Sequence, residues 1–214
     1  MTALHFATLK NNYHVVEALL NSRKIDTNIQ QNEGIDFFIY LVPLHIACKN
    51  GNYFLVRLLM SIELTNVNAQ DVEGRTPLHY AVMNNHLNTV IELLKSPQIN
   101  VNAKQADELT ALHLAAEKRF MNIIQVLIQN AGIDFYTKLS NGSTVFHEAV
   151  RSMNLELVRN ILSTNFDVNC ADDFGCTALH IACQIGFIDC IKLLLLNEKI
   201  DVNLQQKVFS FLFS

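Results

Sequence analysis

Residues 71–81 read DVEGRTPLHYA, and the last five of these residues return in similar form along the chain. The shared pattern is a small or apolar residue, an aliphatic or Phe residue, then His, any residue, and Ala. It occurs at residues 3–7, 43–47, 77–81, 111–115, 145–149 and 178–182. The intervals between successive motif histidines are 40, 34, 34, 34 and 33 residues. A period this regular predicts stacked units, each too small to bury its own apolar face.

The residues around the motif predict two helices in each unit. Thr76 precedes Pro77, which suits an N-cap followed by Pro at the first helical position. Thr stands at the same place at residues 2, 110, 144 and 177. The Ala that closes the motif is small enough to let neighbouring helices pack closely. Farther along each unit, apolar residues at helical spacing, such as Val90, Leu93 and Leu94, predict a second helix.

With its six copies of this pattern, the chain resembles the ankyrin repeat, in which a β-turn finger is followed by two antiparallel helices. The resemblance covers residues 2–205 and implies an all-α, ankyrin-repeat solenoid of stacked helix–turn–helix units joined by β-turn fingers. We expect a domain of about six repeats over residues 1–205, with a six-residue insertion near residues 35–41. We expect residues 206–214 to be a divergent apolar tail. The ends lack obvious polar caps, which favours a fragment of a longer protein.

Two further residue types have expected structural roles. Each motif His is expected to bond the backbone of a neighbouring finger or the Thr hydroxyl of its own unit. The Asn that closes most units can bond turn backbone. The turn between the two helices normally carries Gly, which Gly51 and Gly186 retain, whereas Asn11, Asn85, Arg119 and Met153 replace it. Glu108 likewise stands where a finger would have Gly.

Composition limits the classes of partner and location. The net charge is -4 with a pI of about 6.0, and no basic patch is evident, so we expect no nucleic-acid partner. No apolar run approaches the about 18 residues that span a bilayer, so we expect no membrane insertion. The five Cys form no CxxC, which favours a reducing compartment. We therefore expect a soluble, cytoplasmic protein, most simply a monomer.

The second finger departs most from the pattern. Residues 35–41 (IDFFIYL) are strongly apolar, and Val42 stands where the capping Thr should be, a loss that should cost about 1 kcal/mol. One interpretation is a protruding hydrophobic finger that docks a partner through Phe37 and Phe38. The alternatives are a loop folded against the adjacent repeat, or a misjoined reading frame in the source gene.

No recognisable catalytic or cofactor motif occurs in the chain. Cys176, His180 and Cys183 form the only local cluster of metal-ligand types, but zinc would need a fourth ligand and convergence. The motif histidines lie one repeat apart, too far for a shared metal. We therefore predict no catalytic residues, no metal, no cofactor and no enzymatic activity.

The resemblance implies where a protein partner would bind, namely at the finger tips and the exposed side of the motif-carrying helices. The candidate partner-binding residues are Tyr80, Met83, Leu114, Lys118, Arg75 and Phe174, together with Phe37 and Phe38 of the insertion. Tyr80, Met83, Leu114 and Phe174 are expected to be exposed anchors, because large apolar side chains dominate interface energy. The chain is thus predicted to be a non-enzymatic interaction scaffold. Alternatives are a regulatory or anchoring segment of a longer enzyme, channel or toxin, a spacer, or a solvated face without a ligand.

Overall fold

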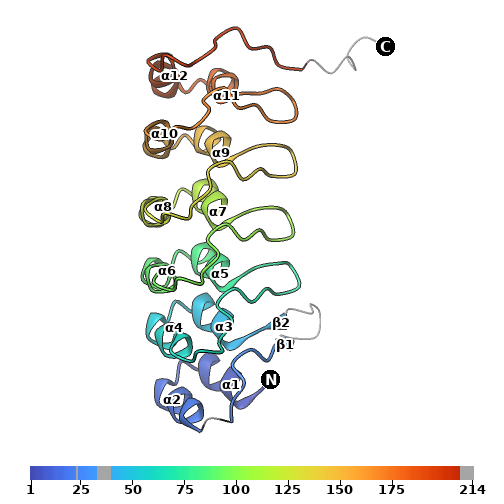
Figure 1. The fold of residues 1–214 in the computed structure, drawn as a ribbon, viewed down its shortest axis with the longest axis vertical. Coiled ribbons are helices and arrows are strands. Elements are labelled where there is room, and N and C mark those ends of the chain that lie inside the picture. Colours follow the sequence, from blue (N-terminus) through green and yellow to red (C-terminus); the bar gives the residue numbers. More distant parts are fainter. Residues whose placement is uncertain (23, 33–39, 208–214) are drawn as a thin grey trace, which may run out of the picture. The chain divides into compact units, whose positions relative to one another are not determined.

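The computed structural model describes residues 1–22, 24–32 and 40–207, in which twelve helices and two short strands occur. The helices follow one another in pairs (Figure 1). The pairs are α1 (Ala3–Leu9) and α2 (Tyr13–Asn21), α3 (Pro43–Lys49) and α4 (Tyr53–Met60), α5 (Pro77–Met83) and α6 (Leu87–Leu94), α7 (Ala111–Glu117) and α8 (Met121–Ile128), α9 (Val145–Arg151) and α10 (Leu155–Leu162), and α11 (Ala178–Ile185) and α12 (Ile188–Leu195). The predicted all-α repeat fold is confirmed.

The chain divides into two compact units. The first holds residues 1–114 and 125–133, and the second holds residues 115–124 and those from 134 onward. Within the first unit, the motif-carrying helices α1, α3 and α5 pack neighbour to neighbour, and α2, α4 and α6 do the same beside them. Within the second unit, α9 packs on α11 and α10 packs on α12. Each layer therefore buries its apolar face against the next layer, as a repeat array requires.

The motif supplies the core of each layer. The residue before the motif His is at most 1% exposed in the first five repeats, as at Leu4 and Phe146. The closing Ala is fully buried in all but the first repeat, as at Ala81 and Ala115. A larger side chain at this Ala would force neighbouring helices apart, because protein interiors are close-packed.

Four of the six motif histidines join their own helix to the following finger. The ring Nδ1 accepts from the N-cap, as where the Thr76 N–H and hydroxyl lie 3.1 and 2.8 Å from Nδ1 of His79. The ring Nε2 meets a carbonyl oxygen of the next finger, from His5 to Leu41 (3.0 Å), His45 to Arg75 (3.0 Å), His79 to Leu109 (3.2 Å) and His147 to Cys176 (3.1 Å). A carbonyl only accepts, so Nε2 carries the proton and the ring is neutral. The predicted bonds to Thr and to finger backbone are both present.

Burial keeps these rings neutral. It lowers the pKa of His45 to about 4 and lowers the pKa of His5, His79 and His147 as well, because the charged ring would lose its hydration. Both ring nitrogens of these histidines are already engaged by the fold. They are therefore structural residues.

A second ladder of hydrogen bonds runs along the ends of the repeats. The Asn28 amide donates to the carbonyl of Leu64 (2.7 Å), and its oxygen accepts from the Asn66 N–H (2.7 Å). Asn68 and Asn169 make the same pair of bonds to the repeats that follow them. In the fourth repeat Tyr136 takes this place: its hydroxyl donates to the carbonyl of Asn165 (3.1 Å) and accepts from the Asp167 N–H (3.2 Å).

The turns between paired helices use the left-handed backbone conformation, which explains the Gly expected there. Gly51 has φ 71° and Gly186 has φ 69°. Arg119 (φ 57°) and Met153 (φ 54°) adopt the same conformation with a side chain present, as do Asn11 and Asn85. In the fourth finger Glu108 has φ 67°, close to the 71° of Gly74 in the third.

The second finger begins and ends in a short antiparallel pair of strands. Residues of β1 (Gln31–Asn32) pair with those of β2 (Tyr40–Leu41), with Gln31 opposite Leu41. Leu41 is fully buried, so the end of the apolar segment belongs to the core. Residues 35–39, with Phe37 and Phe38, lie outside the described residues. At Val42 the missing hydroxyl leaves only the backbone N–H to bond His45 Nδ1 (3.1 Å).

Candidate partner-binding surfaces

The third and sixth fingers are held by aspartates at their bases. Oδ1 of Asp71 accepts from the N–H groups of Glu73 (2.9 Å) and Arg75 (2.8 Å). Asp172 does the same in the second unit, accepting from Phe174 (3.0 Å) and Cys176 (2.9 Å). Such side-chain bonds to backbone two residues on are the usual way in which Asp fixes a turn. The base of the finger therefore sets its shape, and the side chains at its tip do not.

Large apolar side chains lie at these tips. Val72 is 51% exposed in the first unit, and Phe174 is 42% exposed in the second. Val72 directly follows the anchoring Asp71, and Phe174 lies two residues after the anchoring Asp172. Phe174 is thus on the surface, where the sequence placed it. Lys118, in the second unit, is also exposed.

Two other predicted residues of the first unit are half-buried. Arg75 forms an ion pair with Glu73, and Met83 ends α5. Both still present part of the side chain to solvent. The exposed Lys49 and Asn50 occupy the corresponding end of α3.

The expectation that Tyr80 and Leu114 are exposed anchors is wrong. Tyr80 is 5% exposed, its hydroxyl donates to Oδ2 of Asp71 (2.7 Å), and its ring meets that of His45 edge-on at 5.5 Å. Burial and the Asp71 carboxylate raise the pKa of Tyr80 well above its ordinary value. Leu114, at the same motif position, is 4% exposed. In these two repeats the residue after the motif His therefore faces the interior.

Sequence reasoning missed an aromatic surface on the second helices of the first unit. Phe54 is 54% exposed and Tyr13 is 37% exposed, and together with Asn52 they line a hollow of about 290 Å³. Tyr53 lies against Phe54 with ring centroids 4.1 Å apart. A signal was present, because the other five repeats have polar residues at the position of Phe54: His14, Asn88, Asn122, Glu156 and Asp189.

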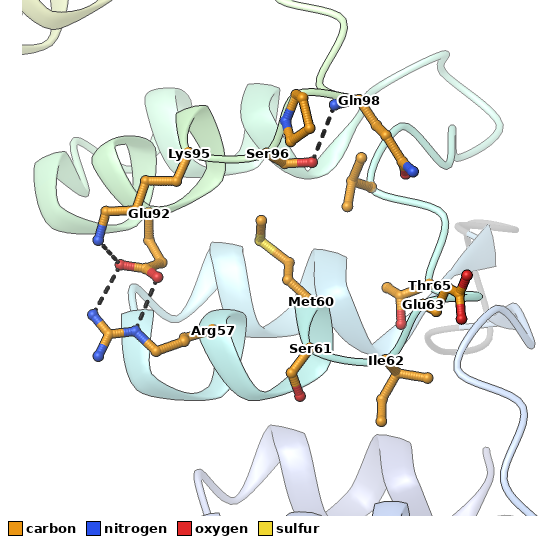
Figure 2. Close-up of a pocket in the computed structure, with 12 residues that line it drawn as sticks. Arg57, Met60, Ser61, Ile62, Glu63, Thr65, Glu92, Lys95, Ser96 and Gln98 are labelled. Carbon is orange, nitrogen blue, oxygen red and sulfur yellow. Dashed lines mark hydrogen bonds and ion pairs between the residues drawn. The ribbon is translucent and has the colours of Figure 1, made fainter.

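The hollow between α4 and α6 contains a charged cluster (Figure 2). Glu92, with its side chain 9% exposed, accepts from Arg57 Nε (2.9 Å) and Lys95 Nζ (2.6 Å). The Arg57 hydrogen bond is the main cause that lowers the pKa of Glu92 to about 2. Met60 points into the same hollow of about 430 Å³. Both carboxylate oxygens are occupied, so the cluster ties two repeats together and offers no free acid.

Within residues 1–22, 24–32 and 40–207, no group of three or more His, Cys, Asp or Glu could hold a metal ion. No helix in that part of the chain combines the length and the hydropathy that a bilayer crossing requires.

Comparisons with known proteins agree with the repeat architecture. A family model described as ankyrin repeats (3 copies) matches residues 44–138 and 112–206, and a model of the single ankyrin repeat matches residues 1–32. A comparison with curated proteins gives no match. Among solved structures, the chain is similar to the ankyrin repeat domain of Bcl-3, described as a unique member of the IkappaB protein family. The TM-score is 0.85 with 26% identity, over 97% of this chain and 90% of that one.

Proposed function

The chain belongs to the ankyrin repeat family, and from this membership we propose that it is a non-enzymatic module that binds a protein partner through its finger tips and motif-carrying helices. Ankyrin repeats are in general protein–protein interaction modules. The observation that supports this surface is the exposure of Val72 and Phe174 at the finger tips. The hydrogen bonds that shape these two fingers come from Asp71, Asp172 and the backbone, so the fold alone does not require apolar tips.

The proposed contacts include the surface residues that the sequence singled out. Arg75 belongs to the third finger and Met83 ends α5, and Lys118 and Phe174 belong to the second unit. Exposed apolar side chains beside charged ones are typical of a binding surface with an apolar centre and a polar rim. Ile185, 40% exposed at the end of α11, adds a second apolar side chain in the second unit.

A capture experiment tests this surface. The purified chain and a Val72→Glu/Phe174→Glu variant are used to retain proteins from a cell extract, and the retained proteins are identified by mass spectrometry. Phe54→Glu is the matched control, because Phe54 is equally exposed but lies on a second helix. We expect a protein retained by the chain and the control to be lost from the double variant, with equal helical circular dichroism in all three.

Two outcomes would contradict the proposal. Retention of the same proteins by all three chains would show that the finger tips are not the binding surface. Loss only with Phe54→Glu would move binding to the aromatic surface around Phe54 and Tyr13.

A further inference from the structure

The last helix pair exposes a face that each earlier pair buries. Three residues after the motif His, the side chain is fully buried in the first five repeats, as at Cys48 and Val150, but Cys183 is exposed. Eleven residues after the His, the side chain is at most 1% exposed in the first five repeats, but Ile191 is half-buried. Leu195, near the end of α12, is 53% exposed. We call Cys183, Ile191 and Leu195 the trailing face.

The first helix pair exposes the opposite set of positions. Phe6 is 53% exposed, whereas Ile46 at the same position of the second repeat is 1% exposed. Val15 is 44% exposed, whereas its counterparts, such as Leu55, are fully buried in all later repeats. Ala3 is exposed where later repeats have a buried residue. We call Ala3, Phe6 and Val15 the leading face.

The polar groups of the two faces are also complementary. In four of the five earlier repeats Nε2 of the motif His donates to the carbonyl of the residue that precedes the next N-cap, whereas the hydrogen bonds of His180 within the described part of the chain involve Nδ1 and the backbone and not Nε2. The matching carbonyl on the leading face is that of Met1, which precedes the N-cap Thr2. His180 thus lacks the type of acceptor that the leading face presents.

Within the residues that the structure describes, the ladder of asparagine hydrogen bonds between repeats also leaves complementary groups unbonded at its two ends. Asn203 stands where Asn68 and Asn169 bond the next repeat, and no partner of its side-chain amide occurs among the described residues. Ladder bonds go to residues four and two positions before the next ladder residue. Before Asn28, these positions are the carbonyl of Lys24 and the N–H of Asp26. Neither group has a hydrogen bond within residues 1–22, 24–32 and 40–207.

We propose that copies of this chain associate head to tail, with the trailing face of one copy packed on the leading face of the next. Such a contact would continue an interface that the molecule already contains, because α3 packs on α1 and α11 packs on α9. Apolar faces of this kind are buried between neighbouring units in repeat arrays. The hydrogen-bonding groups on the two faces stand at the positions that bond adjacent repeats to each other, so the expected occupant of each face is the end repeat of another copy. The two surfaces differ, so the contact is heterologous and growth need not stop at a dimer.

This proposal differs from the monomer that the sequence favours, and it is independent of the proposed partner surface. The trailing and leading faces lie on α11–α12 and α1–α2, whereas Val72 and Phe174 lie on fingers. Either proposal can fail without the other.

Sedimentation velocity of the full chain over a wide concentration range tests it. We expect the wild type to form a series of oligomers that lengthens with concentration. Phe6→Glu on the leading face and Leu195→Glu on the trailing face should each sediment as monomers, and both sites are exposed enough for the variants to fold. Phe54→Glu, equal to Phe6 in type and exposure, should associate as the wild type does. Circular dichroism checks that all variants are equally helical.

Mixing the two monomeric variants gives the sharper result. Phe6→Glu retains an intact trailing face and Leu195→Glu an intact leading face, so an equimolar mixture should form a dimer and no larger species. A wild type that stays monomeric throughout would overturn the proposal. Oligomers that persist in Leu195→Glu alone, or a mixture that stays monomeric, would also overturn it.

Discussion

Four motif histidines, at residues 5, 45, 79 and 147, each connect three pieces of the chain at once: the N-cap, the first turn of the helix and the following finger. His79 does so through two bonds at Nδ1 and one at Nε2, all with the ring neutral. A second proton on Nδ1 would remove an acceptor and place a charge in a buried site. Stability should therefore depend on the protonation of these rings.

We predict that acid weakens the fold well before the carboxylates titrate. The pKa of His45 is about 4 in the folded chain against 6.5 for an unperturbed His, so between these values the unfolded chain binds more protons. The contribution of each such His to the free energy of unfolding should be complete above pH 6.5. It should fall by up to about 1.4 kcal/mol per pH unit as the pH drops toward 4. His5, His79 and His147 act in the same direction.

Thermal unfolding measured at several pH values from 7.5 to 5 checks this prediction. The midpoint should fall steadily below pH 6.5, and a variant in which the exposed His14 is replaced by Gln should show the same fall. A midpoint that stays constant over this range would contradict it.

At Val42 we predict that a hydroxyl stabilises the chain. Val42→Thr keeps the side-chain shape and restores the bond to His45 Nδ1 that Thr76 makes to His79. The free energy of unfolding should rise by about 1 kcal/mol, and Thr76→Val should lower it by a similar amount. Denaturant unfolding of both variants measures this. A loss of stability in both would show that the site of Val42 cannot accommodate a hydroxyl.

Single residues also show how far the sequence could predict the site. The bonds of His and Asn followed from their position before a finger or a turn, because local chemistry fixes them. The burial of Tyr80 and Leu114 depends on which way a helix face points within a stack, and the repeat period does not specify that direction. Ile46 and Ile181 at the same position carried the missing hint, since a surface position is rarely apolar so often.

At the scale of the element, the helix–helix turn carries avoidable strain. Met153 has φ 54°, a conformation that costs a side-chain-bearing residue about 1–2 kcal/mol, partly offset by the greater chain entropy of Gly in the unfolded state. Met153→Gly should therefore raise the free energy of unfolding by about 0.5–1 kcal/mol.

The control for this turn is Gly186→Ala, since no atom lies within 4 Å of the added Cβ and only the backbone cost remains. It should lower stability by about 1 kcal/mol. Equal signs for the two variants in denaturant unfolding would refute the backbone explanation.

The elements follow from the sequence more completely than the connection at the second finger does. The helix pairs agree with the predicted motif, cap and turn positions. The β1–β2 pairing does not, because the backbone pairing of residues 31–32 with 40–41 leaves no periodic signal in so short a strand. Likewise Tyr136 shares only a hydroxyl with the Asn that it replaces, so no residue pattern marks it as a member of the ladder.

At the scale of the whole molecule, stability should be distributed and not all-or-none. The helix contacts described within each unit join adjacent repeats, as α1 with α3 and α3 with α5. A chain that ends after the third repeat, at residue 104, should therefore retain much of the helical signal of α1–α6 and unfold at a lower temperature than the full chain. Circular dichroism measures this, and complete loss of helical signal would contradict the nearest-neighbour description.

Because Tyr136 stands where the other repeats have an Asn, the hydrogen bonds between repeats should not all age in the same way. Asparagine is among the least heat-tolerant residues, and its slow conversion to aspartate would replace the donor facing the carbonyl of Gln98 or Lys199 with a negatively charged oxygen. At those positions a hydrogen bond between repeats would be replaced by repulsion between a carboxylate and a carbonyl oxygen as the sample ages. The phenol of Tyr136 has no amide to lose, so its rung should outlast those built on asparagine.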